Sequence, residues 1–553
     1  MQNQHQTLLA IVFGLLVGCG GGRSSLKPPT DPPVPTVSPS SESPSSTTDV
    51  LTYHNNNART GENLGETQLT PTNVNVNSFG KLFVMPVDGK VDAQPLYVSQ
   101  VALSDNSRHN LLFVATEHDT VYAFDGDTGK KIWQVSLLGP DETTSDPRAC
   151  DQVVPEIGIT ATPVIDRKSG PHGSLYAIAM SKDSAGNYFQ RLHALDLANG
   201  SEQFGGPQEV QARYPGTGDG SDGQQVVFDP KQYKERAGLL LLNGIIYTTW
   251  ASHCDIRPYT GWIIGYDEQT LKQVRLLNLT PNGSGGSFWN SGAGPAADDS
   301  GNIYLLQANG TFDRNLDEAG FPETGNFGNA FLKVSTNGTL SVADYFTMHD
   351  TVSQSARDED LGSGGVLLIP DTSDETGKTA HLAVGAGKDG SIYLANRDKM
   401  GKFNPEDNHN IHQQLVRALP GSEFGMAAYS NGLLYFGDVN GRLKAFRLSG
   451  AFLSPVPESE SSNTFPYPGT TPSVSGSGSS SRIVWAVENS ANAVLYAYDA
   501  NDLAKELYSS DQASSGRDYF GQGNKFVVPT IVNGKVYVGT VNSVAVFGLL
   551  PAK

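Results

Sequence analysis

Few residues of this chain have the types and spacing that catalysis or metal binding requires. The sequence contains no H-E-x-x-H zinc motif and no G-x-S-x-G in a strand–turn–helix context. Oxygen ligands for a hard cation are available, because Glu156, Asn290, Asp360 and Glu423 each precede or open a predicted strand. The alternative, which we favour, is that these polar groups line a solvated channel or cap turns. Motifs alone therefore predict no activity.

The elements that would position these groups belong to a repeat. Residues 112–133 contain two short runs of β-branched and aromatic residues, a tight turn and the start of a third strand. In the turn, Asp125 supplies an acceptor for backbone amides, and Gly129 tolerates a positive φ angle. Trp133 lies on the third strand, where we expect it to pack against a neighbouring repeat. This pattern predicts most of one blade of a β-propeller.

Copies of this unit recur along the chain. The Y-A-F-D of residues 122–125 returns in related form at Asp196, Asp267 and Asp499, with further and more degenerate copies elsewhere. The copies lie roughly 50 to 70 residues apart, a spacing typical of propeller blades. We therefore predict an all-β protein, a single propeller of four-stranded blades, with eight blades favoured and seven as the alternative. Strand 80–87 has no preceding partners, so we expect it to join the C-terminal blade and close the ring.

Composition restricts the possible functions. The chain carries 38 Lys and Arg against 57 Asp and Glu, a formal net charge of −19 at pH 7. Such an acidic protein repels phosphate backbones, so nucleic-acid binding is not expected. No apolar run reaches the length of about 18 residues that a membrane-spanning helix needs. We expect a monomer.

The N-terminus has the pattern of a targeting segment. A short apolar stretch, residues 8–17, ends at Leu-Val-Gly-Cys, which resembles a bacterial lipobox, although residues 1–7 lack Lys and Arg. We predict a lipoprotein signal peptide over 1–18, and lipidated Cys19 with a disordered Gly/Ser/Pro/Thr tether over 19–49. The propeller then spans 50–549, with a tail at 550–553. The expected location is the cell envelope, anchored by acyl chains to the outer membrane; the alternative is a plain secretory signal.

Two further cysteines, Cys150 and Cys254, remain once Cys19 is assigned to lipidation. Exported proteins meet an oxidising compartment, where two remaining cysteines commonly pair. Both are predicted in loops between strands, so a disulfide that links neighbouring blades is the favoured interpretation. The alternatives are two unpaired thiols or, with His253, a metal site that lacks the usual ligand spacing.

The phrase A-x-D-x-x-T-G-x-x-x-W, intact at residues 123–133, resembles the repeat of the PQQ-like, quinoprotein alcohol dehydrogenase-like propeller superfamily. The resemblance covers about residues 50–549 and implies a fold rather than one activity. Quinoprotein dehydrogenases of this fold hold pyrroloquinoline quinone (PQQ) between a Trp and a vicinal Cys-Cys disulfide, with calcium bound by Glu, Asn and Asp. The vicinal cysteines are absent here. The residues retained as candidates for a channel or cofactor site are Glu156, Trp289, Asn290, Asp360 and Glu423.

Three functions from different classes are compatible with these features. The first is a non-catalytic module that binds a protein or glycan through its long loops near 138–158, 201–235 and 451–469. The second is a PQQ-dependent dehydrogenase, with PQQ and Ca²⁺ as cofactors. The third is a scaffold for the assembly of outer-membrane proteins. We favour the first over the second.

Overall fold

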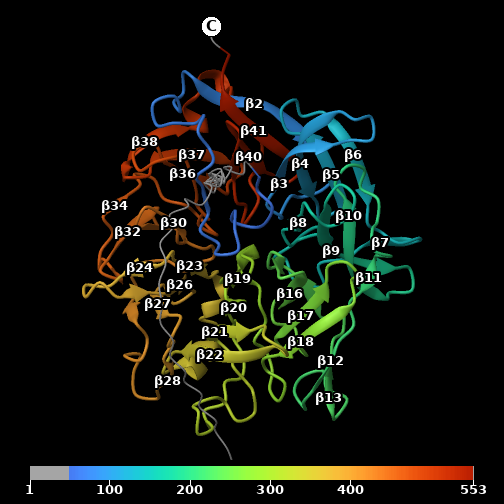
Figure 1. The fold of residues 1–553 in the computed structure, drawn as a ribbon, viewed down its shortest axis with the longest axis vertical. Coiled ribbons are helices and arrows are strands. Elements are labelled where there is room, and N and C mark those ends of the chain that lie inside the picture. Colours follow the sequence, from blue (N-terminus) through green and yellow to red (C-terminus); the bar gives the residue numbers. More distant parts are fainter. Residues whose placement is uncertain (1–48, 552–553) are drawn as a thin grey trace, which may run out of the picture. The chain divides into compact units, whose positions relative to one another are not determined.

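The computed structural model describes residues 49–551. The predicted signal peptide, Cys19 and nearly all of the tether lie outside the described residues. From residue 49 onward the chain forms eight antiparallel sheets of four or five strands, arranged in a ring (Figure 1). The predicted eight-bladed β-propeller is confirmed. Within 49–551 no helix has the length and apolar character needed to cross a membrane.

The first four blades follow one another along the chain, each beginning with its innermost strand. They consist of β3 (Leu96–Ala102), β4 (Arg108–Ala115), β5 (Thr120–Asp125) and β6 (Lys131–Ser136); β8 (Val164–Asp166), β9 (Ser174–Asp183), β10 (Tyr188–Asp196) and β11 (Gln208–Glu209); β15 (Leu240–Leu242), β16 (Ile245–Ser252), β17 (Trp262–Asp267) and β18 (Gln273–Asn278); and β19 (Ala296–Ala297), β20 (Asn302–Leu306), β21 (Ala330–Ser335) and β22 (Ser341–Thr347).

The last four blades have the same order. They consist of β23 (Leu367–Leu368), β26 (Leu382–Ala386), β27 (Ile392–Asn396) and β29 (Gln413–Leu415); β30 (Ala428–Ser430), β31 (Leu433–Phe436), β32 (Lys444–Ser449) and the short β33 (Phe452–Leu453) and β34 (Ser459–Glu460); β35 (Ser473–Ser475), β36 (Ile483–Glu488), β37 (Val494–Asp499) and β38 (Asp502–Ser509); and β39 (Thr530–Val532), β40 (Lys535–Gly539), β41 (Ser543–Leu549) and β2 (Phe79–Pro86).

Short elements in the connections complete the fold. They are β1 (Glu62–Asn63), β7 (Glu142–Thr144), β12 (Arg213–Pro215), β13 (Gln225–Val227), β14 (Tyr233–Glu235), β24 (Thr372–Ser373), β25 (Thr379–Ala380), β28 (Lys402–Phe403), the helix α1 (Thr351–Ala356), and the single-turn 3-10 helices η1 (Asn290–Gly292), η2 (Leu361–Ser363), η3 (Ser510–Gln512) and η4 (Ser514–Gly516).

The ring closes through the two ends of the propeller sequence. Strand β2, from the N-terminal part, pairs antiparallel with β41, from the C-terminal part (Figure 1). The predicted closure by strand 80–87 is therefore confirmed, with strand bounds one residue earlier. Because β41 is paired on both sides, the eighth blade has no open edge where the ring begins and ends.

Stacking of the blades explains why their middle strands lack the usual alternation of buried and exposed residues. All six residues of β5 are buried, because neighbouring blades cover both faces of the sheet. Trp133 shows how one blade is joined to the next. Its ring is 9% exposed, and its Nε1 donates a hydrogen bond to the Leu197 carbonyl of the second blade at 3.0 Å.

The repeated turns owe their shape to the Asp of each copy. Asp125 Oδ1 accepts hydrogen bonds from the Thr128 amide at 2.8 Å and the Thr128 hydroxyl at 2.7 Å, and Gly129 has a φ of +73°. The same contacts recur from Thr270 to Asp267, at 2.9 and 2.7 Å. Asp196 and Asp499 each accept the amide two residues later, at 2.9 Å. A local side-chain acceptor thus ends the third strand in these blades.

A segment that the sequence left unexplained, residues 50–63, contacts all eight blades in chain order. It does so through hydrogen bonds with their innermost strands, involving in turn Tyr97, Ile165, Leu241, Ala297, Leu368, Tyr429, Val474 and Ile531. We call residues 50–63 the collar. Because its contacts follow the ring, the collar links blades that are distant in sequence.

Arg59 organises the collar. The residue is 0% exposed and its guanidinium donates hydrogen bonds to the Pro295, Tyr53 and Leu239 carbonyls, at 2.9, 2.8 and 3.2 Å. Burial lowers the pKa of Arg59 to about 9. A buried cation with this many acceptors is a structural residue, and it joins the collar to the third and fourth blades.

Candidate functional site

Charged and aromatic residues gather at one end of the ring. In an antiparallel blade, the loop before the innermost strand and the loop between the second and third strands lie at the same end, which we call the entry end. Residues from five such loops lie near one another there: Lys90, Asp92, Glu117, Lys234, Arg236, Trp289, Lys525 and Phe526. We call this set the axial cluster.

Strand alternation explains how Lys234 comes to face away from its own blade. On either side of it in β14, Tyr233 Oη accepts a hydrogen bond from the Thr260 amide at 3.0 Å, and Glu235 Oε1 accepts one from the Thr249 amide at 3.1 Å. Both partners belong to the third blade. Successive side chains of a strand point to opposite sides, so Lys234 points away from these partners, toward the axial cluster.

Lys234 and Arg236 are buried without a direct hydrogen-bond or ion-pair partner. Their exposed fractions are 3% and 4%. Within residues 49–551 neither side chain takes part in a hydrogen bond or an ion pair, and the Arg236 Nη1 atom is fully buried. Unpaired buried charges are costly, so this pair marks a place where an acceptor is missing.

Aromatic rings form the other side of the cluster. The Arg236 Cζ lies 4.7 Å from the centroid of the Phe526 ring, and that ring lies 6.5 Å from Trp289. Trp289 also contacts Phe424, at 5.7 Å between centroids. A Cβ placed on Gly292, three residues after Trp289, would meet no atom within 4 Å, so open space adjoins Gly292. A cation–π contact occupies one face of the guanidinium and leaves its N–H groups free.

Asp92 and Glu117 form a carboxyl pair beside these cations. Glu117 Oε2 accepts hydrogen bonds from the Gly158 amide at 2.8 Å and the Thr160 hydroxyl at 3.0 Å. Burial and the neighbouring Asp92 raise the pKa of Glu117 well above its ordinary value. Burial also opposes ionisation of Asp92, but Lys90 and the hydrogen bond with Glu117 hold the pKa of Asp92 low. Ionisation is therefore favoured at Asp92 and disfavoured at Glu117.

The cations outnumber the anions in the axial cluster. Burial, followed by the charge of Arg236, lowers the pKa of Lys234 to about 7. The same two causes lower the pKa of Lys525. Asp92 is the one carboxylate of the cluster that stays ionised, opposite Arg236 and three lysines. The cluster therefore favours an anion.

Two of the sequence-predicted residues lie close to the cluster. Asp360 Oδ2 forms an ion pair with Lys388 Nζ at 2.6 Å, and burial raises the pKa of Asp360 to about 6 despite this partner. Lys388 Nζ lies 5.6 Å from the Trp289 centroid. Glu423 Oε1 accepts the Gly425 amide at 2.9 Å, and burial together with Asp438 raises the pKa of Glu423 to about 8.

The other two polar candidates have different partners. The Asn290 amide donates hydrogen bonds to the Leu306 and Gly364 carbonyls, both at 2.9 Å, and so joins backbone segments of neighbouring blades. Glu156 lies farther out, where its Oε2 is 3.0 Å from His118 Nδ1 and accepts the Thr144 hydroxyl at 2.7 Å. The structure thus brings Trp289, Asp360 and Glu423 toward the axis and leaves Glu156 on the surface.

These contacts do not fit the calcium and PQQ arrangement that the resemblance implies. Among residues 49–551 no three His, Cys, Asp or Glu side chains are grouped to hold a metal ion. The Asn290 amide is occupied by carbonyls, and Asp360 is neutralised by Lys388. The two cysteines of the propeller are 104 residues apart, so their disulfide is not the vicinal one. No reaction step is assigned to PQQ.

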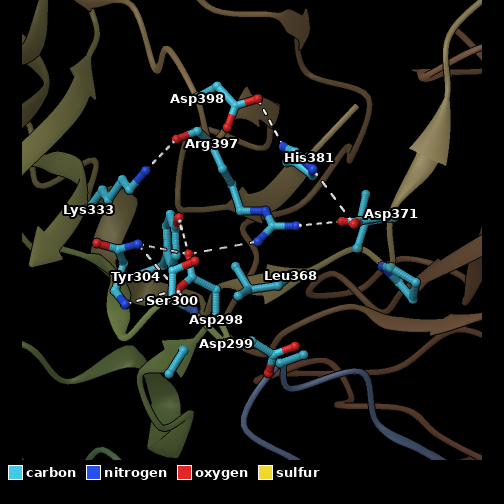
Figure 2. A pocket seen from close by; sticks show the side chains of 15 residues that line it. Asp298, Asp299, Ser300, Tyr304, Lys333, Leu368, Asp371, His381, Arg397 and Asp398 are labelled. Atoms are coloured by element: carbon cyan, nitrogen blue, oxygen red, sulfur yellow. Dashed lines mark hydrogen bonds and ion pairs between the residues drawn. The ribbon is translucent and has the colours of Figure 1, made fainter. Parts of the chain in front are cut away.

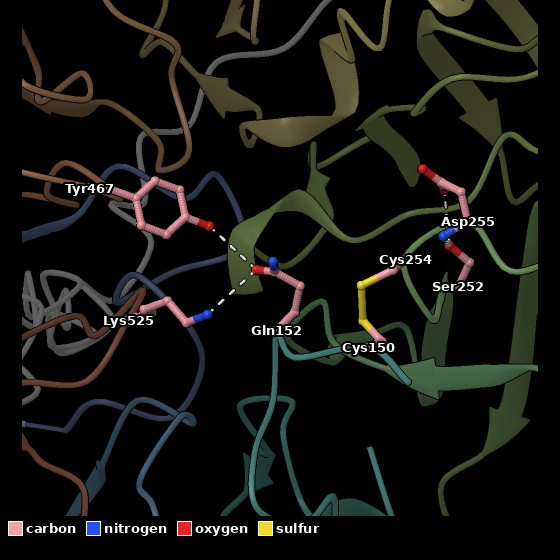
Figure 3. The surroundings of a disulfide bond; sticks show 7 residues. All are labelled: Cys150, Gln152, Ser252, Cys254, Asp255, Tyr467 and Lys525. Carbon is pink, nitrogen blue, oxygen red and sulfur yellow. Dashed lines mark hydrogen bonds between the residues drawn. A yellow bond between two sulfur atoms is a disulfide. The ribbon is translucent and has the colours of Figure 1, made fainter. Parts of the chain in front are cut away.

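A loop fastened by that disulfide crosses the entry end. Cys150, before the second blade, is bonded to Cys254, in a loop of the third (Figure 3). Two residues later, Gln152 Oε1 accepts hydrogen bonds from Tyr467 Oη at 3.3 Å and from Lys525 Nζ at 3.4 Å. Tyr467 and Lys525 precede the seventh and eighth blades. The loop around Gln152 therefore covers part of the axial cluster.

A small cavity beside the cluster, lined in part by Phe424, Asn524 and Phe526, has a volume of about 10 Å³, room for roughly one water molecule.

A larger cavity, of about 520 Å³, lies at the opposite end of the ring, between the fourth and fifth blades (Figure 2). Most of its charged groups are paired. Arg397 donates a hydrogen bond to Asp371 Oδ1 at 3.1 Å and lies 3.9 Å from Asp298 Oδ2. His381 Nδ1 is 2.9 Å from Asp398 Oδ2, and Lys333 Nζ donates to the Arg397 carbonyl at 2.8 Å. We call this site the base cavity.

Lys234 and Arg236 are the functional candidates that sequence reasoning missed. They stand in K-E-R, immediately before the apolar innermost strand of the third blade. The signal available in the sequence is the K-E-R run itself, three charged residues that interrupt the pattern of a buried strand. The predicted binding loop 201–235 contains Lys234, but nothing local in the sequence shows that loops from other blades cover this residue.

No family model and no curated protein matches the sequence. Solved structures match over nearly the whole chain. A quinohemoprotein alcohol dehydrogenase from Comamonas testosteroni has a TM-score of 0.58 at 14% identity, over 92% of this chain and 81% of its own. One from Pseudomonas putida HK5 has a TM-score of 0.60 at 12% identity, over 91% and 81%. A europium-containing methanol dehydrogenase has a TM-score of 0.58 at 13% identity, over 91% and 98%. The chain therefore has the PQQ-like β-propeller fold that these dehydrogenases share.

Proposed function

We propose that this chain is a non-catalytic binding module that holds a small organic anion in the axial cluster. The observation that carries the proposal is the pair Lys234 and Arg236, two buried cations without an acceptor among residues 49–551. An anionic ligand would supply the missing counter-charge. A carboxylate suits the guanidinium because it accepts two parallel N–H groups. The rings of Trp289 and Phe526 offer an apolar surface to an organic body.

Calorimetric titration of the full-length protein tests this proposal. The panel contains mono-, di- and tricarboxylates at low ionic strength, together with PQQ, which is itself a tricarboxylate. We expect at least one carboxylate to bind and to raise the melting temperature. Arg236→Gln should weaken that binding by about 10- to 100-fold, the equivalent of losing a charged hydrogen bond worth about 1.5–3 kcal/mol. Arg397→Gln, in the base cavity, is the matched control. Absence of binding by every anion at millimolar concentration would overturn the proposal.

A PQQ-dependent oxidoreductase is the second candidate, favoured by the excess of cations in the axial cluster. PQQ binding combined with reduction of a dye by an alcohol would support this candidate. PQQ binding without turnover would support the binding module.

We also propose that lipidation of Cys19 holds the module at the cell envelope. Metabolic labelling with a fatty acid would test this proposal by comparing the protein with Cys19→Ser.

A further inference from the structure

The base cavity has the properties of a second binding site, separate from the axial cluster. Its volume of about 520 Å³ lies within the range of pockets that hold small organic molecules. The fourth and fifth blades form its walls, together with Ala58 of the collar. Leu368 and Pro370 give it an apolar part, and polar side chains line most of the rest (Figure 2). This lining suits a ligand with charged ends joined by an apolar chain.

One cation of the base cavity lacks an opposite charge. Lys333, on β21, donates a hydrogen bond to the Arg397 carbonyl at 2.8 Å, and no carboxylate among residues 49–551 lies within 4 Å of its Nζ. That bond uses one of the three N–H groups of the ammonium. The Arg397 guanidinium donates to Asp371 through Nη2, while its buried Nε has no partner. Lys333 and Arg397 therefore leave N–H groups open to an acceptor such as a carboxylate.

Carboxylates outnumber the cations around the same cavity. Four of its lining residues are aspartates, against the two permanent cations Lys333 and Arg397. The aspartates are Asp298, Asp299, Asp371 and Asp398. The Asp299 side chain is exposed, and within the described part of the chain its carboxylate takes part in no hydrogen bond or ion pair. The surplus of negative charge attracts a cationic group, and Asp299 is free to receive it.

We propose that the base cavity binds a zwitterion whose ammonium and carboxylate are several bonds apart, as in an ω-amino acid or a short peptide. The carboxylate contacts Lys333 and Arg397, and the ammonium contacts Asp299. Figure 2 shows Lys333 and Asp299 apart from each other, with Asp298 between them in this view. A ligand that reaches both needs a chain between its charges, and Leu368 offers that chain an apolar contact.

Calorimetric titration of the full-length protein with compounds of equal chain length tests this site. Aminocaproate carries both charges, whereas hexylamine and caproate carry one each. We expect aminocaproate to bind at least about tenfold more tightly than either, because the second contact forms within a complex that the first has already made. Glycine, whose charges are one carbon apart, should bind more weakly than aminocaproate. Equal affinity for hexylamine and aminocaproate, or no binding of any of these compounds at millimolar concentration, would overturn the proposal.

The same titration separates the two sources of such a zwitterion. Triglycine has the separated charges of aminocaproate on a peptide backbone. Tighter binding of triglycine would identify a peptide as the ligand, and tighter binding of aminocaproate would identify an ω-amino acid.

Two variants locate the bound compound. Lys333→Gln removes a charge but keeps a donor for the Arg397 carbonyl, and Asp299→Asn removes a charge from an exposed side chain of the same shape. Each should weaken aminocaproate binding about 3- to 10-fold. The matched controls Lys231→Gln and Asp141→Asn, at exposed positions outside the base cavity, should have no effect. Unchanged binding in both base-cavity variants would overturn this proposal and leave the anion site of the axial cluster standing.

Discussion

The base cavity and the axial cluster hold their charges in opposite ways. In the base cavity, Arg397 lies between Asp371 and Asp298, and each cation has an acceptor. In the axial cluster, Lys234 and Arg236 are more deeply buried and have none among the described residues. The base cavity has a volume of about 520 Å³. The buried Arg397 Nε has no partner, but the Arg397 guanidinium is paired through its Nη2, whereas Arg236 has no partner among the described residues; unpaired charge is therefore the better sign of an anion-binding site here.

The largest expected change in stability concerns the disulfide Cys150–Cys254 at the entry end. Reduction of Cys150–Cys254 should lower the free energy of unfolding by about 4–5 kcal/mol, because the bond closes a loop of 104 residues in the unfolded chain. Urea unfolding with and without reductant measures this change. Ligand association should also become faster, since the Gln152 loop is released. Gln152→Ala, which keeps the disulfide, should change the association rate alone; equal stability of the two redox forms would contradict the prediction.

Loss of a paired cation should destabilise the protein. Arg397→Gln removes the partner of Asp298, whose side chain is 12% exposed, and of Asp371, which is 60% exposed. We expect the free energy of unfolding to fall by about 1–2 kcal/mol, a modest value because Asp371 is well solvated. Urea denaturation provides the measurement, and anion binding should be unchanged.

Loss of the unpaired cation Arg236 should have the opposite effect on the free energy of unfolding. Without ligand, Arg236→Gln should leave the free energy of unfolding unchanged or raise it by about 1 kcal/mol, because a buried charge without an acceptor is removed. The same denaturation series measures this difference. A destabilisation as large as that of Arg397→Gln would remove the contrast between the two ends.

The charge of Lys234 should be visible in the pH dependence of stability. Burial lowers its pKa from 10.5 to about 7, so between these values the unfolded chain binds more protons than the folded protein. The free energy of unfolding should therefore rise with pH across this window, by up to about 1.4 kcal/mol per pH unit. Lys234→Met should lose this part of the slope. Comparing the two proteins at each pH isolates Lys234 from other titrating groups, and parallel curves would show that its pKa is ordinary.

The smallest effect is expected at Glu156. Its pair with His118 is solvated, with side chains 24% and 47% exposed. Glu156→Gln should change the free energy of unfolding by less than about 1 kcal/mol and leave anion binding intact. Thermal unfolding and titration check both values, and a marked loss of binding would extend the axial cluster to the surface.

Local signals explain why the fold was predictable. The turn around Asp125 and Gly129, the β-rich runs beside it and their copies at Asp267 and Asp499 each act over a few residues, and repetition makes the pattern plain. The closing strand was predictable because residues 80–87 lacked partners at one end of the sequence and the last blade lacked a strand at the other. The collar was not, since its contacts join residues 50–63 to sites up to residue 531.

The candidate site was predictable only in part. Asp360 and Glu423 were predicted as candidates because they precede inner strands, and Trp289 as an aromatic candidate for a cofactor site; Lys388 contacts both Asp360 and Trp289 in the structure. Asn290 was selected for the same reason, but its amide is taken by backbone carbonyls. Residue type and position predict which end of the ring a side chain reaches. They do not predict which acceptor it meets.

The sequence by itself determined the blades and their closure, and favoured eight blades over seven, because strand alternation and turn chemistry are encoded within each repeat. Only the tertiary structure decided which charges are paired. Arg397 and Arg236 are alike in sequence, each following a β-strand. One meets Asp371 and Asp298, and the other meets the ring of Phe526. Coulombic and hydrogen-bond energies depend on distances of a few ångströms between residues that lie tens to hundreds of positions apart, and the packing of eight blades sets those distances.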